Sequence, residues 1–177
     1  MEAHISLENM ITFLLTTPMF EDLEPKEVME IIHIVDVLEF KAGDAIFREN
    51  DPGDGWYALY RGEVEVLKQS ESGEKTIKTL ETQACFGEIA VLDSLPRSAT
   101  IRATQDSVVL RVPQDKFNEL ADKGGPIACK LIKKMALLLA GRQRANTEIL
   151  SNLLLTNELS EVHQRINEVV GDSSLRE

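Results

Sequence analysis

Residues 85–103 read C-F-G-E-I-A-V-L-D-S-L-P-R-S-A-T-I-R-A, and this stretch decides how the rest of the chain is interpreted. Phe86, Gly87 and Glu88 open it, and a short apolar turn follows. Gly87 has no Cβ, so another group can approach the backbone closely there. The amides that follow Gly87 would form the open first turn of a short helix, where unpaired N–H groups and the positive end of the dipole attract an anion. The stretch therefore predicts an anion site beside the glycine.

The second half of the same stretch supplies a positive charge and a hydroxyl. Pro96 is rigid and places Arg97, whose forked set of donors suits phosphate oxygens. Ser98 adds the hydroxyl on the same loop. Glu88 would repel a phosphate, but its carboxylate can accept a hydrogen bond from a neutral ribose 2′-hydroxyl next to that phosphate. One phosphate with an adjacent ribose hydroxyl describes a 3′,5′-cyclic nucleotide.

The stretch closely resembles the phosphate-binding cassette of the cyclic-nucleotide-binding domain family, F-G-E-[IL]-A-x(6)-P-R-[SAT]-A-T, and every defined position is met. The resemblance extends over about residues 15–145. A lone P-R-S-A-T would mean little, but several motifs in the order of the family are specific. The upstream motifs that resemble the family's first signature are Phe40-x-x-Gly43-Asp44-x-Ile46-Phe47, Asp51-x-Gly53-Asp54-x-x-Tyr57 and Gly62-x-Val64-x-Val66.

The resemblance implies a role for each part of the cassette. Arg97 would pair with the exocyclic phosphate oxygens, Ser98 and Ala99 would add donors from hydroxyl and backbone, and the backbone around Gly87 would hold the sugar-phosphate. Glu88 would hold the 2′-hydroxyl. The alternative for Arg97 and Glu88 is a surface ion pair between two loop residues, which is worth little. The ligand-binding residues predicted in the cassette are Phe86, Gly87, Glu88, Ile89, Ala90, Arg97, Ser98 and Ala99.

Recognition of the base is less well defined than recognition of the phosphate. Bacterial cyclic-AMP regulators of the family commonly carry serine after the cassette arginine, as this chain does at Ser98. Base contacts in the family usually come from the long C-terminal helix, where this chain has Arg142 and Gln143 in place of two small hydroxyl residues. Arg142 either contacts the base or is a solvated helix residue. The resemblance implies cyclic AMP as the ligand, with cyclic GMP as the alternative.

Composition sets the class of protein. The chain has 177 residues, of which 43% are hydrophobic, enough for one domain with a core and an extension. Acidic residues outnumber basic ones by 30 to 19, for a net charge of −11, which argues against a nucleic-acid-binding surface. We find neither an apolar run long enough for a membrane span nor a signal sequence, and we expect a cytoplasmic protein with no membrane partner. Cys85 and Cys129, both in apolar surroundings, are predicted to be buried thiols outside any disulfide.

The hydrophobic pattern predicts an α+β fold in three parts. Residues 1–36 read as N-terminal helices, one capped by Ser6 and one beginning at Pro25. Residues 37–125 read as short strands with turn residues between them, followed by a helix opened by Pro113. This pattern indicates an antiparallel β-roll of jelly-roll type, closed on itself like a barrel. Residues 126–177 would form one long C-terminal helix.

The long helix carries an apolar seam with four-three-four-three spacing. This spacing predicts a short coiled coil and a homodimer; the alternative is a helix that folds back on the roll. Gly124-Gly125 and Gly141 could act as hinges, so we expect the occupied site to favour one orientation of the helix. The downstream protein partner is not indicated. The seam consists of Leu155, Leu159, Val162, Ile166 and Val169.

Other functions known on similar folds require residues or segments that we do not find in this sequence. A metal-dependent enzyme on a similar roll needs histidines on the strands, but His4, His33 and His163 all fall outside the predicted roll, which also argues against a haem sensor. A winged helix-turn-helix of the catabolite-activator type does not follow the long helix, and no inhibitor segment of a kinase regulatory subunit precedes the roll. We therefore expect a cyclic-nucleotide sensor without catalysis or a metal. The remaining alternatives are a structural dimerisation module and a fragment of a larger effector.

Overall fold

The computed structural model describes the backbone of residues 5–173 and the side chains of residues 5–156. The N-terminal helices form as the sequence predicts. The Oγ of Ser6 caps α1 (Leu7–Thr16) by accepting the N–H of Asn9. A 3-10 turn, η1 (Pro18–Phe20), leads to α2 (Pro25–Ile32), which begins with the proline.

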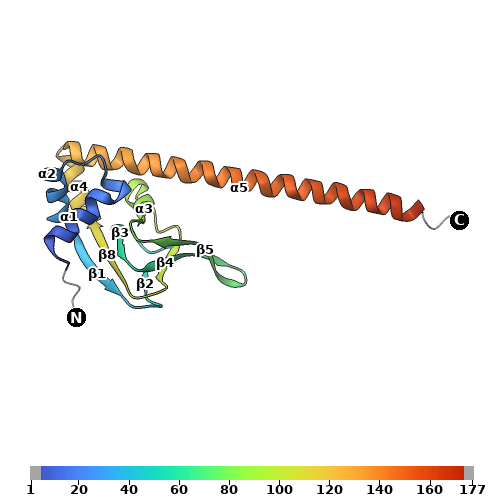
Figure 1. Ribbon diagram of the computed structural model, residues 1–177, viewed down its shortest axis with the longest axis horizontal. Helices are drawn as coiled ribbons and strands as arrows, with labels where there is room; N and C mark the ends of the chain where they lie inside the picture. The colour runs from blue at the N-terminus through green and yellow to red at the C-terminus, as the bar shows by residue number, and fades with distance from the viewer. Residues whose placement is uncertain (1–4, 174–177) are drawn as a thin grey trace. The chain divides into compact units, whose positions relative to one another are not determined.

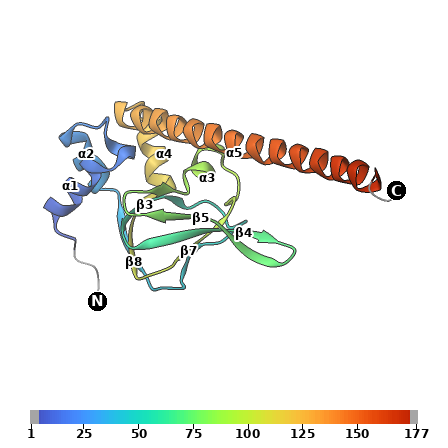
Figure 2. The same ribbon diagram turned by 45° about the vertical axis from the view of Figure 1, so that its right-hand side comes forward.

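The eight strands described in residues 5–173 form two antiparallel sheets of four strands each, with the orders β1-β8-β3-β6 and β2-β7-β4-β5. The predicted antiparallel roll is confirmed, but the expected closure into a barrel is wrong, because each sheet has its own edge strands. Figures 1 and 2 show α1, α2 and α4 at one end of the roll and the β4–β5 hairpin at the other. The strands are β1 (Asp36–Phe40), β2 (Ala45–Phe47), β3 (Gly55–Arg61), β4 (Glu63–Ser70), β5 (Gly73–Glu81), β6 (Cys85–Phe86), β7 (Thr100–Ala103) and β8 (Ser107–Pro113).

The core lies between the two sheets. β8 pairs with β1 and β3 and carries a nearly continuous apolar run, residues 108–112, interrupted only by Arg111. Consecutive residues of β8 are buried, so both faces of the strand are covered, which explains why its apolar residues do not alternate with polar ones. The central buried cluster consists of Tyr57, Leu59, Val64, Phe86, Ile101 and Val109.

Helices follow the cassette and the last strand. α3 (Glu88–Asp93) is the short apolar turn inside the cassette. α4 (Gln114–Asp122) starts one residue later than predicted, because Pro113 has an extended ψ of 142° and serves as the N-cap rather than the first helical residue. Gly124 has a left-handed φ of 64°, a conformation that commonly follows the end of a helix. The chain therefore changes direction after α4, and α5 (Pro126–Ser173) begins two residues later.

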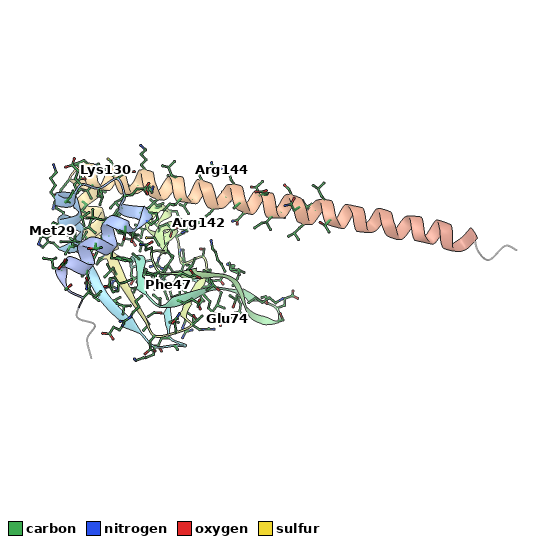
Figure 3. The ribbon with its side chains drawn as sticks, viewed as in Figure 1. Met29, Phe47, Glu74, Lys130, Arg142 and Arg144 are labelled. Carbon is green, nitrogen blue, oxygen red and sulfur yellow. The ribbon has the colours of Figure 1, made fainter. Side chains whose placement is uncertain are left out.

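The start of α5 is anchored on the N-terminal helices (Figure 3). Leu131 and Met135 are almost fully buried. Nζ of Lys130 donates to Oε2 of Glu27 on α2 over 2.7 Å. This hydrogen bond lowers the pKa of Glu27, which also accepts the backbone N–H of Glu24. Apolar burial and one partly buried ion pair therefore fix the first turns of α5.

The chain divides into two compact units, Met1–Met135 and Ala136–Glu177. The predicted three-part division of the chain stays a prediction. In the second unit the large apolar side chains described up to residue 156 are more than half exposed in the stretch Ile149, Leu150, Leu153, Leu154 and Leu155. The other four seam residues lie outside the described side chains. None of the described helices is long and apolar enough to cross a membrane.

One cysteine differs from expectation. Cys85 is buried at 5% exposure, as predicted, because β6 lies inside the roll. Cys129 is exposed. Its prediction as a buried thiol was wrong, because it occupies the outer side of α5 while its neighbours Ile127 and Ala128 face the roll.

Candidate functional site

The cassette begins where β6 ends. Gly87 has φ 80°, in the left-handed region that side chains with a Cβ rarely adopt. A Cβ added there would lie 2.8 Å from Nη1 of Arg97 and 3.3 Å from ring atoms of Phe47 and Tyr57. Gly87 is therefore required twice, once for the backbone conformation and once for the space that the guanidinium of Arg97 occupies.

Arg97 is buried, at 2% exposure. Its Nη1 donates to the carbonyl of Gly87 over 2.7 Å, and its Nη2 donates to the carbonyl of Gly55 over 2.7 Å and to Oδ1 of Asp54 over 2.6 Å. The guanidinium lies 4.2 Å from the ring centroid of Phe47, which Figure 3 labels in the roll. Arg97 is therefore not a surface residue, and its side chain forms an ion pair with Asp54 inside the roll.

Asp54 joins Arg97 to a second arginine. The hydroxyl of Tyr57 donates to the Asp54 carboxylate over 2.9 Å, and Nη1 of Arg111 donates to its Oδ2 over 2.9 Å. Arg111 in turn donates to Asp36 on β1 over 2.7 Å. Burial raises the pKa of Asp54, but hydrogen bonds from Tyr57, Arg97 and Arg111 outweigh it and leave the pKa below its usual value. Asp54 is therefore a carboxylate held between two guanidinium groups.

The same surroundings act on the other two members of this group. Burial, together with the charge of Asp54, raises the pKa of Tyr57 to about 12. The pKa of Arg111 is raised, first by the hydrogen bond to Asp36. Tyr57 therefore stays a neutral donor, and Arg111 stays a cation, throughout the physiological range.

One hydrogen-bond donor of the site, the Nε of Arg97, has no partner within the part of the chain that the structure describes. Among the side chains described in residues 5–156, the Nε of Arg97 and the Nε1 of Trp56 are the buried polar atoms with no hydrogen-bond partner. A buried donor without a partner is uncommon in folded proteins and calls for an explanation. The Nε of Arg97 lies in a polar cassette, so an acceptor oxygen of a ligand would satisfy it.

Glu88 also lies in the interior, at 2% exposure, as the first residue of α3. The carboxylate in that position is shielded from bulk solvent. Ala90, on the same turn of α3, packs closely on Gly53, where an added Cβ would lie 3.1 Å from that of Ala90. The two glycines Gly53 and Gly87 thus let α3 and Arg97 approach the roll.

The structure places the remaining predicted cassette residues in different environments. Phe86 is a core residue: its ring stacks on Tyr57 with centroids 5.4 Å apart. Ile89 is 41% exposed, Ser98 is exposed and Ala99 is half-buried. The backbone groups of Gly87, Ala99 and the start of α3 thus share the cassette with Arg97 and Glu88, whereas the side chain of Phe86 supports the site from inside the roll.

The exit of the cassette is fastened to the turn after β2. The N–H of Asn50 donates to the carbonyl of Arg97 over 2.9 Å, and the N–H of Arg97 donates to the carbonyl of Asp51 over 2.8 Å. The N–H of Glu49 donates to Oγ1 of Thr100 over 2.9 Å. These bonds hold the backbone on both sides of Ser98.

Arg142 and Gln143 belong to the second compact unit, on α5. Their predicted contact with the base stays a prediction.

Sequence reasoning missed the acidic and aromatic partners of Arg97. Asp54 and Tyr57 belong to an upstream motif to which the sequence assigns no role, and Arg111 is the polar position within the apolar run of residues 108–112. A charged residue inside a run that otherwise forms a buried strand was the signal, since such a residue needs a partner.

Comparison with known proteins identifies the roll. Residues 37–123 match the family model of the cyclic nucleotide-binding domain. The roll is a cyclic nucleotide-binding domain. A cAMP-dependent protein kinase regulatory subunit of Emericella nidulans is 36% identical over 115 residues, which are 65% of this chain and 27% of that protein. The chain thus spans about a quarter of the length of the curated relative that it matches.

Two solved structures are similar to this cyclic nucleotide-binding domain in fold and sequence. The regulatory domain of Toxoplasma gondii PKA, co-crystallised with cAMP, has a TM-score of 0.59 and 26% identity, covering 63% of this chain and 43% of that one. The catabolite activator protein of Thermus thermophilus has a TM-score of 0.68 and 28% identity, covering 77% of this chain and 62% of that one. The domain is therefore similar to proteins of two kinds, kinase regulatory subunits and a catabolite activator protein.

Proposed function

We propose that the protein is a cyclic-AMP sensor. The observation that carries the proposal is the buried Arg97, which has an unpaired Nε donor and shares the cassette with the interior carboxylate of Glu88. The names of the kinase regulatory subunits and the cAMP of the Toxoplasma gondii structure support cyclic AMP as the nucleotide. These relatives are regulatory by name, and we propose no catalytic step.

The geometry of Arg97 determines how a phosphate would bind. Two of the guanidinium's acceptors are backbone carbonyls, and the third is Asp54. A phosphate oxygen would take the Nε donor and compete with Asp54 for the positive charge. Asp54 keeps Tyr57 and Arg111 as donors when that contact weakens, so the exchange leaves no carboxylate unpaired. Glu88 would accept the ribose 2′-hydroxyl.

The signal would pass through α5. The first turns of α5 are held on α2 by Lys130 and by buried apolar residues, while Gly141 lowers the helix propensity farther along. A ligand shifts the orientation of the later part only by its differential affinity for two orientations. The exposed apolar residues 149–155 and the seam of the sequence support a homodimer through α5 as part of this proposal.

Calorimetric titration with cyclic AMP, cyclic GMP and 2′-deoxy cyclic AMP tests the proposal. Wild type should prefer cyclic AMP, and the deoxy analogue should bind more weakly because Glu88 loses its partner. Arg97→Ala should cost roughly 2–4 kcal/mol of binding free energy. Arg61→Ala is the matched control, since Arg61 is an exposed arginine at the end of β3 outside the cassette. A wild type that binds none of the three nucleotides would overturn the proposal.

One observation favours a second function, a structural module without a ligand. Arg97 already meets three internal acceptors, so it stabilises the roll by itself. Under this alternative saturating cyclic AMP leaves the melting temperature of wild type unchanged. Under the sensor proposal the nucleotide raises that melting temperature.

A further inference from the structure

β4 continues past the end of its neighbour β7, and side chains take over where the backbone pairing stops. The last β4–β7 pair joins Leu67 and Thr100. Immediately beyond it, Nζ of Lys68 donates to the carbonyl of Ser98 over 2.8 Å and forms an ion pair with Glu49. The N–H of Gln69 donates to Oε2 of Glu49 over 3.2 Å. Lys68 and Glu49 thus connect β4 to the exit of the cassette.

This Lys68–Glu49 pair is fixed in place. Glu49 is 18% exposed, and its own N–H is bonded to Thr100. The hydrogen bond from Lys68 lowers the pKa of Glu49, so the carboxylate stays ionised under ordinary conditions. Lys68 is about half exposed, but two fixed acceptors hold its ammonium, one of them the Ser98 carbonyl.

The carbonyl of Ser98 and the N–H of Ala99 belong to the same peptide unit. A trans peptide is planar, and its C=O and N–H point in opposite directions. A bond that holds the Ser98 carbonyl toward Lys68 therefore also directs the N–H of Ala99 away from Lys68. That N–H is one of the donors predicted to meet the phosphate. The contact that orients the Ser98 carbonyl thus also orients the N–H of Ala99, which we predict to donate to the ligand.

The neighbouring peptides are held in other ways. Arg97, before this peptide, has both its N–H and its carbonyl bonded to the turn after β2. Thr100, after it, begins β7. The Ser98–Ala99 peptide lies between these two anchors, where the contact that fixes its direction comes from the Lys68 side chain.

We propose that Lys68, supported by Glu49, is a positioning residue that orients the Ser98–Ala99 peptide for the phosphate of the ligand. Lys68 acts through the peptide and does not itself touch the nucleotide. This inference rests on the proposed cyclic-nucleotide binding and adds a residue outside the cassette to it.

The first test compares affinities for cyclic AMP by calorimetry. Lys68→Met should bind about tenfold more weakly, as expected for loss of one charged hydrogen bond. Lys68→Arg keeps a donor for Ser98 and should bind like wild type. Lys75→Met is the matched control, because Lys75 is an exposed lysine directly opposite Lys68 in the β4–β5 pair. It removes the same charge from the same region without touching Ser98, so its affinity should stay within about twofold of wild type.

The second test separates positioning from general loosening of the roll. In the two phosphorothioate diastereomers of cyclic AMP, sulfur replaces one or the other exocyclic oxygen. If Ala99 donates to one oxygen, Lys68→Met should weaken binding of the diastereomer that keeps that oxygen and change the other much less. The amide hydrogen of Ala99 should also exchange faster in Lys68→Met than in Lys75→Met. Equal losses for both diastereomers would overturn the inference.

Each outcome is decisive. If wild type binds no cyclic nucleotide, the proposed function fails, and this inference fails with it. If wild type binds and Lys68→Met binds equally well, only the inference about Lys68 is overturned. Should Lys68→Met fold poorly, Glu49→Gln replaces it: the ammonium then loses its charged support, and the same change in diastereomer ratio is expected, in a smaller degree.

Discussion

Two arginines five positions apart, Arg97 and Arg102, pair with carboxylates in opposite environments. The Arg97 side chain is 1% exposed and meets Asp54 and two carbonyls beneath α3, whereas the Arg102 side chain is 28% exposed and meets Glu74 and Glu65 on the outer face of β4, β5 and β7. Both arginines pair with carboxylates. The difference teaches that burial and backbone acceptors, not the presence of an ion pair, distinguish the cassette arginine from an ordinary surface arginine.

The largest expected effect is the loss of the interior arginine. Arg97→Ala removes three hydrogen bonds and leaves the Gly55 and Gly87 carbonyls without their donor, so the free energy of unfolding should fall by about 3 kcal/mol. Urea denaturation followed by circular dichroism measures it. A loss no larger than that of Arg102→Ala would contradict the contrast between the two regions.

A smaller effect should follow from filling the space beside Arg97. Gly87→Ala places a Cβ 2.8 Å from Nη1 of Arg97 and demands a left-handed backbone from alanine, so we expect a loss of about 2 kcal/mol. Gly73→Ala is the control, because Gly73 has φ 104° but nothing within 4 Å of an added Cβ. The two variants share the backbone strain, and only Gly87→Ala should also weaken nucleotide binding.

Alkaline pH should weaken the interior region through Tyr57. Tyr57 has a pKa of about 12 in the folded protein against 10.0 ordinarily, so the folded state retains a proton that the unfolded state loses. The stabilisation is complete below pH 10 and is lost as the pH rises through 12; at pH 11 it amounts to about 1 kcal/mol after allowance for solvent screening. Urea midpoints at pH 9 and pH 11 measure it. Tyr57→Phe should reduce the difference between the two midpoints by this contribution, and an unchanged difference would contradict the prediction.

The smallest effect should come from the surface pair. Arg102→Ala should lower the free energy of unfolding by about 0.5 kcal/mol, since Arg102 and its acidic partners remain accessible to water. Added salt should reduce this difference further, whereas it should change the effect of Arg97→Ala little. A salt-insensitive loss at Arg102 would mean that this pair is not an ordinary surface interaction.

The sequence predicted those features that depend on local patterns. Ser6 and Pro25 mark helix starts, because capping and the preference for proline in the first helical turn are local rules. The anion site at Gly87 and Arg97 is predicted from residue chemistry together with the resemblance to the family, and it stays a prediction. Sheet closure did not follow, because the pairing partners of edge strands such as β5 and β6 depend on the whole fold.

The partners of Arg97 could not be predicted from spacing. Asp54 is 43 positions away in the sequence and Arg111 is 14 positions beyond Arg97, and only the β3–β8 pairing brings them together. Phe86 shows the opposite error. Its place in the cassette motif suggests a ligand residue, whereas its ring is buried in the core and stacks on Tyr57.

Trp56 provides an intrinsic optical probe of this site. It is the chain's single tryptophan, it is fully buried, and its ring stacks on Phe20 with centroids 5.4 Å apart. Its backbone follows Gly55, whose carbonyl receives the guanidinium of Arg97. An indole in such apolar surroundings emits at short wavelength, and its fluorescence can be recorded without any label. Rearrangement of the arginine beside it should therefore be visible in the emission of the native protein.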